Sequence, residues 1–306
     1  MCEYWWVLWA YACCDCGYVR MNTDARSGRK MTREKIIDLA KQFVHDSKGN
    51  YITAEAAESP SCDGLRLFDA PIFAFGHVDD ELYEQFKSGE AIGAHFISPL
   101  EWLSDAKTVI AIFFPYSEQI KEANSKDYDW PAPEWLHARY DGQLFLKETV
   151  MYIQQLLIDA GHKSIIPSFD ERFKSGDTRD KSGDAANRFT SNWSERHIAY
   201  ACGLGTFGLS KGLITEKGVC GRFASIITEL DLSKDVRKYK DIYEYCTMCK
   251  KCISNCPPRA ISDNGKEHLP CSDFIDVTFD KHKPRYGCGK CQVSVPCMSA
   301  APGLRG

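Results

Sequence analysis

The sequence predicts a mixed α and β core domain followed by a small cysteine-rich domain. Two observations support this prediction: helix-type and strand-type apolar patterns recur through the first part of the chain, and eight cysteines cluster near its end. A length of 306 residues allows two domains or one large one, and 44% hydrophobic with 26% charged residues is ordinary for a globular protein. We expect the core at residues 31–235 and the cysteine-rich domain at residues 236–306.

Residues 1–30 stand apart from the predicted core. Their first part is apolar and aromatic, too short to span a bilayer, and without the basic region and cleavage site of a signal peptide. We expect a disordered extension or the product of an upstream start site. A further metal site is the alternative, although no recognised ligand spacing is present among Cys2, Cys13, Cys14 and Cys16.

The core opens with a helix and a strand. Thr32 is suited to cap a helix whose apolar residues, including Ile36 and Phe43, recur at helical spacing. Residues 108–114 form a continuous apolar run rich in β-branched and aromatic side chains. Such a run predicts a strand that is buried on both faces.

A second helix and a polar segment follow. Apolar side chains share one helical face over residues 144–160, and Gly161 is suited to end that helix. We expect a short strand at residues 164–167. Residues 170–188 hold many charges, serines and glycines and few apolar side chains, which predicts a solvated loop or an active-site lid.

A glycine-rich segment follows a predicted helix at residues 193–202. Its glycines match the dinucleotide fingerprint G-x-G-x-x-G, but that motif has meaning only after a strand and before a helix. Here strand-like runs at residues 213–215 and 224–228 follow instead. Glycines let a backbone approach a large flat ligand, and a tight turn is the alternative explanation. The candidate cofactor-binding residues are Gly203, Gly205, Gly208 and Arg222.

The most informative motif is a run of cysteines with the spacing C-x-x-C-x-x-C-x-x-x-C-P. It consists of Cys246, Cys249, Cys252 and Cys256, followed by Pro257. This spacing is typical of a bacterial-type ferredoxin loop, in which three thiolates hold one four-iron cluster and the fourth reaches a second cluster. The downstream partners are Cys271, Cys288, Cys291 and Cys297. Eight thiols are the number that two 4Fe-4S clusters need.

Other uses of cysteine fit less well. Structural zinc also takes four cysteines, but usually as two separated pairs. A disulfide framework belongs to small secreted domains, and fifteen cysteines without a secretory context favour a reducing, cytoplasmic setting. A formal charge of −4 shows no electrostatic footprint for nucleic acid or an anionic membrane, so we expect no membrane partner.

Taken together, these motifs resemble the epoxyqueuosine reductase and reductive dehalogenase superfamily over roughly residues 95–297. The resembling segments are Ser-Glu-Arg (194–196), the glycine-rich run (201–208), residues 212–215 and 226–232, the ferredoxin loop and residues 286–292. The resemblance implies a flavin-reductase-like core, a dicluster ferredoxin module, and a cobalamin held base-off between them. It also implies a ferredoxin or flavodoxin as electron donor and a small-molecule or modified-nucleoside substrate.

The chain departs from the family at the proton donor. Epoxyqueuosine reductases carry an Asp six residues before the Glu-Arg pair, and Phe189 stands at that position here. The candidate replacements are Asp184, in the neighbouring loop, and His197, whose imidazole titrates near neutral pH.

Two further departures concern the end of the chain. Five residues separate Cys291 from Cys297, where the family usually has three. The helical-repeat domain with which epoxyqueuosine reductases approach tRNA does not follow before Gly306, which makes tRNA a doubtful substrate.

Three functions are consistent with these residues. The first is an iron-sulfur reductase that passes electrons to a corrinoid or substrate site in the core. The second is a ferredoxin-like electron-transfer protein or subunit without cobalamin and without its own substrate chemistry. The third is a cluster protein that senses redox state or binds a partner. A core of this size favours the first, and Phe189 favours the second.

Overall fold

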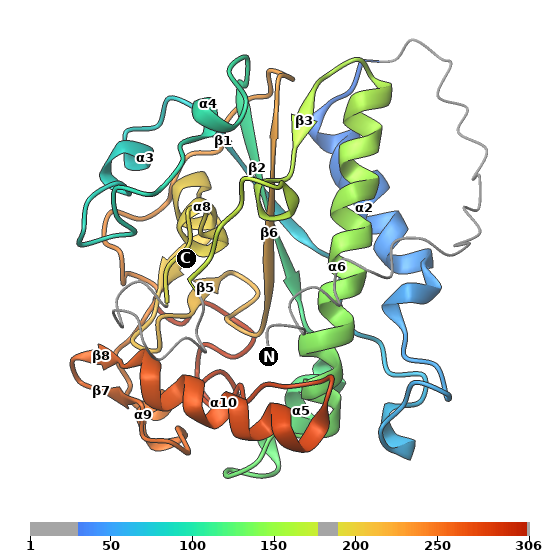
Figure 1. The fold of residues 1–306 in the computed structure, drawn as a ribbon, viewed down its shortest axis with the longest axis vertical. Coiled ribbons are helices and arrows are strands. Elements are labelled where there is room, and N and C mark those ends of the chain that lie inside the picture. Colours follow the sequence, from blue (N-terminus) through green and yellow to red (C-terminus); the bar gives the residue numbers. More distant parts are fainter. Residues whose placement is uncertain (1–29, 177–188, 305–306) are drawn as a thin grey trace. The chain divides into compact units, whose positions relative to one another are not determined.

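A four-stranded sheet with the order β1-β2-β6-β3 lies at the centre of the fold, and each neighbouring pair is antiparallel (Figure 1). Its strands are β1 (Ile72–His77), β2 (Thr108–Pro115), β3 (Ser164–Ile165) and β6 (Gly221–Thr228). This computed structural model describes residues 30–176 and 189–304. The sequence predicts a disordered extension over residues 1–30. Apart from Lys30, these residues lie outside the described part of the chain.

Helices cover both faces of this sheet. On one face, α2 (Arg33–Asp46) and α6 (Pro133–Asp159) lie side by side (Figure 1). The other face is covered by α3 (Leu82–Gln85), α4 (Pro99–Trp102) and α8 (Glu195–Cys202). Alternate residues of β2 enter the two resulting cores, which explains why this strand is buried at every position, as its sequence predicts.

The ends of the helices follow their local sequence. Thr32 Oγ1 accepts a hydrogen bond from the Lys35 N–H at 3.3 Å and so caps α2, as predicted. The α6 helix ends at Asp159 near the predicted stop, but it begins at Pro133, well before residue 144. Buried polar side chains in its first turns, such as Glu134 and His137, interrupt the apolar pattern there.

Short elements complete the fold. A helix, α5 (Glu118–Ser125), packs against α6. The 3-10 helices are η1 (Lys48–Asn50), η2 (Pro60–Cys62) and η3 (Pro167–Phe169). Two hairpins are formed by β4 (Gly205–Phe207) with β5 (Leu213–Thr215) and by β7 (Ile261–Ser262) with β8 (Gly265–Lys266).

The cysteine-rich segment contains α9 (Lys251–Ser254) and α10 (His268–His282), which lie near one end of the central sheet (Figure 1). It packs with the rest of the chain from Met31 onward as one compact unit. The predicted mixture of α and β structure is confirmed. None of the described helices combines the length and the apolar character that crossing a membrane requires.

Candidate functional site

The eight predicted ligand cysteines separate into two groups of four. Electrostatic interactions between the thiols define the groups, because Cys297 interacts with the first three cysteines of the ferredoxin loop while Cys256 interacts with the downstream set. The first cysteine group is Cys246, Cys249, Cys252 and Cys297. The second cysteine group is Cys256, Cys271, Cys288 and Cys291. The last cysteine of each sequence cluster therefore lies with the other group.

The two groups differ in their surroundings. In the first group Cys249 is exposed, and exposed apolar side chains lie close to it along the chain, among them Tyr243 and Met248. The other three cysteines of the first group and all four of the second are partly buried, and those of the second group line a cavity. The first group thus has one ligand at the surface, and the second group faces the cavity.

Burial changes the acidity of the thiols in both groups. It raises the pKa of Cys291 to about 12 and that of Cys288 to about 11, and neighbouring thiols add to both shifts. In the first group it raises the pKa of Cys297 to about 12. Metal ligation requires thiolates, so cluster assembly must displace these protons.

The donor set fits iron-sulfur clusters. Each group offers four soft sulfur ligands, and the Ala260 N–H donates to Cys256 Sγ at 3.2 Å, the type of bond that tunes a cluster potential. Within the described ranges, no three His, Cys, Asp or Glu side chains come close enough to hold a single metal ion. A four-iron cluster occupies a larger volume than one ion, so its ligands can stand farther apart.

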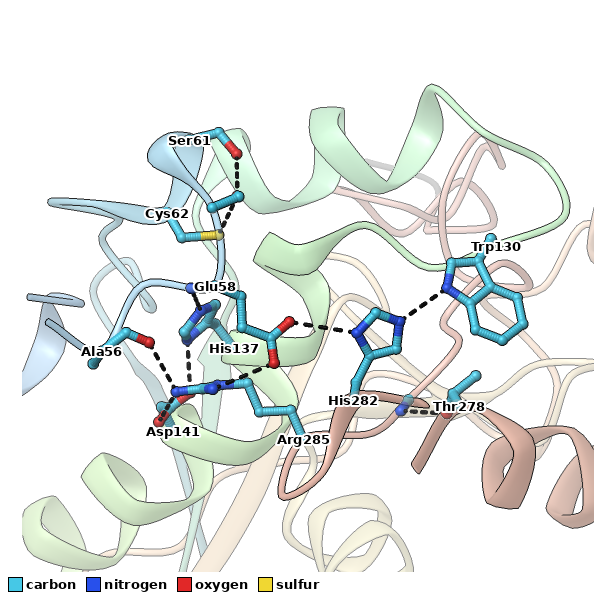
Figure 2. A network of polar contacts seen from close by, with 12 residues as sticks. Ala56, Glu58, Ser61, Cys62, Trp130, His137, Asp141, Thr278, His282 and Arg285 are labelled. Atoms are coloured by element: carbon cyan, nitrogen blue, oxygen red, sulfur yellow. Dashed lines mark hydrogen bonds and ion pairs between the residues drawn. The ribbon is translucent and has the colours of Figure 1, made fainter. Parts of the chain in front are cut away.

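The second cysteine group is anchored to the core through a polar network (Figure 2). Arg285 Nε donates to Asp141 Oδ2 at 2.7 Å, and its Nη1 lies 3.3 Å from Glu58 Oε1. His282 Nδ1 lies 3.5 Å from the other Glu58 oxygen, and the Trp130 indole N–H donates to His282 Nε2 at 3.1 Å. These contacts tie the segment before Cys288 to α6 and to the loop around Glu58.

His137 occupies the buried end of this network. Burial lowers its pKa, but Asp141 and Cys62 raise it more strongly, to about 9. The hydrogen bonds favour the neutral ring nonetheless, because the Glu58 N–H donates to Nε2 at 3.1 Å while Nδ1 faces Asp141 at 2.8 Å. A neutral His137 satisfies both contacts, so we assign it a structural role.

A buried lysine fixes the loop between Cys288 and Cys291. Lys290 is 1% exposed, and its Nζ donates to Asn124 O at 2.8 Å, Asp127 O at 2.7 Å and Asn124 Oδ1 at 3.1 Å. Asn124 in turn donates to Cys288 O at 3.0 Å. The ammonium lies near the carboxyl end of α5, where the helix dipole favours a cation.

A cavity of about 430 Å³ is lined by all four cysteines of the second group, so part of this volume is the space that a cluster held by them would fill. Its other walls come from α6, α8, β6 and α10, so the core and the cysteine-rich segment both contribute to it. The lining is aromatic and cationic, and includes Tyr116, Trp135, Arg139, Arg196, Arg222 and Phe223.

Glu195 is the carboxyl group among the described residues of this lining. Its Oε2 accepts a hydrogen bond from Ser225 Oγ at 2.6 Å, and its buried Oε1 has no partner in the described part of the chain. Burial raises the pKa of Glu195 to about 7, against the opposing effect of the Ser225 hydroxyl. Glu195 can therefore hold a proton near neutral pH.

Of the two predicted acids, only His197 lies in the described part of the chain. His197 packs between the rings of Phe86 and Phe207, its Nδ1 is 2.8 Å from Ser194 Oγ, and it does not line the cavity. Burial and the neighbouring Arg196 lower the pKa of His197 to about 4. Asp184 lies outside the described residues and stays a prediction.

The predicted cofactor glycines are explained by the backbone. Gly203 ends α8 in the left-handed conformation, with φ 102°. A Cβ at Gly205 would lie 2.0 Å from Ile214 O across the β4-β5 hairpin. Gly208 also faces Ile214, and none of the three lines the cavity, whereas Arg222 does.

Sequence reasoning missed Glu195 as an acid and Arg139 and Arg196 as lining residues. The Glu-Arg pair at 195 and 196 was visible as a motif at the start of a helix. Its position against the second cysteine group depends on the packing of α8 beside β6. The sequence alone carries no signal for that contact.

Known reductases share this fold. Two epoxyqueuosine reductase crystal structures, the second with an epoxyqueuosine-modified tRNA stem loop, superimpose with TM-scores of 0.50 and 0.51 at 18% and 19% identity. Each superposition covers 87% of this chain and 65% or 64% of the other chain, so this chain spans slightly less than two thirds of their length. The fold is therefore similar to that of epoxyqueuosine reductases, as the sequence motifs predicted.

Sequence similarity to curated proteins is confined to a short segment. The tetrachloroethene reductive dehalogenases of Desulfitobacterium hafniense and Dehalobacter restrictus are 41% identical over 66 residues, which is 21% of this chain and 12% of theirs. No protein-family model matches the chain.

Proposed function

We propose that this protein is an iron-sulfur reductase in which two 4Fe-4S clusters pass electrons from an external donor to the cavity. The first cysteine group would take up electrons at the surface, and the second would deliver them. The observation that supports this most directly is the division of eight cysteines into a surface group and a cavity-lining group. The flavin-reductase-like core and the ferredoxin module belong to this proposal.

The cavity lining could contact one face of a corrinoid as the electron acceptor, because a volume of about 430 Å³ is too small to enclose the whole cofactor. The aromatic residues Tyr116, Trp135 and Phe223 would contact its flat macrocycle, and the polar side chains of the lining would meet its amide and phosphate groups. When bound, a corrinoid supplies a strongly reducing cobalt centre.

The residues of the chain supply binding and a proton. Glu195 is the lining group that we assign as the acid, because its pKa of about 7 keeps it protonated near neutral pH while its Oε1 lacks a partner among the described residues. Ser225 holds the carboxyl group through Oε2 and accepts a hydrogen bond from the Trp193 indole N–H at 2.9 Å. We propose a small molecule or a modified nucleoside as the substrate.

The test is metal analysis of anaerobically reconstituted protein, followed by reduction with dithionite. We expect about eight irons and eight sulfides per chain, bleaching on reduction, and reoxidation by an electrophilic substrate such as an organohalide or epoxide when corrinoid is present. Iron without reoxidation by any electrophile, with corrinoid supplied, would contradict the reductase.

One observation favours the electron-transfer protein as a second candidate. Phe189, at the position where epoxyqueuosine reductases have their acid, stacks on His268 with ring centroids 5.0 Å apart. A stacked pair of aromatic rings is found there in place of the carboxyl group. A carrier would hold the same iron, bind no corrinoid, and reduce a partner protein instead.

A further inference from the structure

We propose that the cavity binds an oxyanion, a carboxylate or phosphate group of the substrate, through Arg139, Arg196 and Arg222. This inference rests on the proposed function and names the substrate class of the same site. The three arginines come from α6, α8 and β6, and all of them line the cavity.

Among the described residues, none of these arginines forms an ion pair with a carboxylate. Arg196 Nη1 donates to Lys211 O at 2.6 Å, and Arg222 Nε donates to Gln143 Oε1 at 2.7 Å. The Arg139 guanidinium carbon lies 5.1 Å from the centre of the Tyr286 ring. These contacts orient the guanidinium groups without neutralising them. A charge without a counter-ion is costly where it is partly buried, as at Arg139 and Arg222.

The three positive charges affect one another. Burial lowers the pKa of Arg196 and of Arg222, and the charge of Arg139 lowers both further. The positive field extends to His268, whose pKa is lowered to about 4 by burial and by Lys211, Lys266 and Arg196. An anion placed among the arginines would relieve this repulsion.

The second cluster alone would not neutralise the cavity. Besides the three arginines, Lys266 lines the cavity, and Glu195 is the one carboxyl group among the described lining residues. A 4Fe-4S cluster with four thiolates carries a net charge of about −2 in its oxidised form. Positive charge remains in excess, which favours an anionic ligand in addition to the cluster.

Guanidinium groups suit this task because their planar fork matches the two oxygens of a carboxylate or phosphate. Arg196 also interacts electrostatically with Cys291 of the second cysteine group. A substrate held by its acidic group at the arginines would therefore lie beside the cluster that delivers electrons.

The test is calorimetric titration of the anaerobically reconstituted holoprotein with benzoate and with inorganic phosphate. Benzamide, a neutral analogue of benzoate, serves as the matched ligand control. We expect benzoate and phosphate to bind and benzamide to bind at least about tenfold more weakly, because hydrogen bonds to charged groups contribute about 1.5–3 kcal/mol. Equal binding of benzoate and benzamide, or no binding of either anion to cluster-loaded protein, would overturn the proposal.

Substitutions of the lining arginines test where the anion binds. R139Q and R222Q should each weaken benzoate binding at least about tenfold. R66Q, which removes an exposed arginine paired with Asp69 elsewhere on the protein, should leave the affinity unchanged. Unchanged affinity in both cavity variants, with iron content equal to that of the wild type, would contradict the assignment. If a variant does not assemble, the comparison of benzoate with benzamide still tests the proposal on wild-type protein.

A corrinoid phosphate is the other source of an oxyanion, and a competition experiment separates the two. Benzoate affinity that is unchanged by bound cobalamin supports a substrate site. Displacement of benzoate by cobalamin but not by cobinamide, which lacks the nucleotide phosphate, would overturn the substrate assignment. Dithionite reduction of the same samples tests the reductase separately, so loss of anion binding with intact redox chemistry contradicts only the oxyanion site.

Discussion

The first cysteine group lies at the surface near exposed apolar side chains, whereas the second lies against a cavity lined by arginines and aromatic rings. The ligands are chemically the same, so the difference in function must come from the surroundings. A cluster at the surface can exchange electrons with a partner protein, and a cluster beside a cavity can deliver them to a bound molecule. Cys256 belongs to the second group and Cys297 to the first, so each of the two cysteine clusters in the sequence supplies ligands to both groups.

The largest expected effect tests the assignment of Cys256 to the second cysteine group. We expect Cys256→Ser to remove the second cluster, although Cys256 is a neighbour of the first group in sequence. The protein should lose about four of about eight irons and all reduction at the cavity. Cys252→Ser should remove the first cluster, and dithionite should still reduce the second cluster.

Iron analysis and electron paramagnetic resonance of the reduced variants check this prediction. The wild type should show two interacting clusters, and each variant should show a single one with its own spectrum. Identical residual spectra in the two variants would contradict the division into groups.

The next largest effect compares the lysines of the two cysteine segments. Lys290→Met removes a buried ammonium with three hydrogen bonds and should lower the free energy of unfolding by about 3 kcal/mol. Lys250→Met, in the first segment, removes an exposed ion pair with Asp263 and should change it by less than about 1 kcal/mol. Anaerobic urea unfolding measures the free energy of unfolding of both variants. Equal losses in the two variants would contradict the tighter anchoring of the second cysteine segment.

A smaller effect concerns the acid beside the second group. Because the folded-state pKa of Glu195 is raised from 4.5 to about 7, the folded protein keeps a proton that the unfolded chain releases. Stability should therefore fall as the pH rises from about 4.5 to about 7, and Glu195→Gln should remove that part of the slope. We expect the variant to gain roughly 1–3 kcal/mol over the wild type between pH 4.5 and pH 8. A constant difference between the two proteins across this range would contradict the assignment.

The smallest effect concerns electron uptake. Tyr243 and Met248 are 43% and 42% exposed near the first group, and we expect a protein donor to contact them. Met248→Ala should slow reduction by a flavodoxin or ferredoxin several-fold and leave reduction by dithionite unchanged. An equal change with both reductants would indicate damage to the cluster itself.

Local patterns explain what could be predicted from the sequence. The cap at Thr32, the buried strand β2 and the ferredoxin loop all depend on residues that are close together in the chain. The same holds for the end of α6 before Gly161. Spacing alone is enough to identify such elements.

Features that depend on packing could not be predicted in this way. Arg139, Arg196 and Arg222 meet only because α6 and α8 pack against β6 from opposite faces of the sheet. The raised pKa of Glu195 follows from burial, and the sequence gives no measure of burial at that position. The cofactor role considered for Gly203 came from a motif that also fits a helix end.

The most direct test of the central claim is a count of iron, sulfide and zinc on wild-type protein reconstituted without oxygen. Two clusters on two groups of four cysteines require about eight irons and eight sulfides per chain, with no zinc. A colourless protein that holds zinc, or one that saturates at about four irons, would contradict the account.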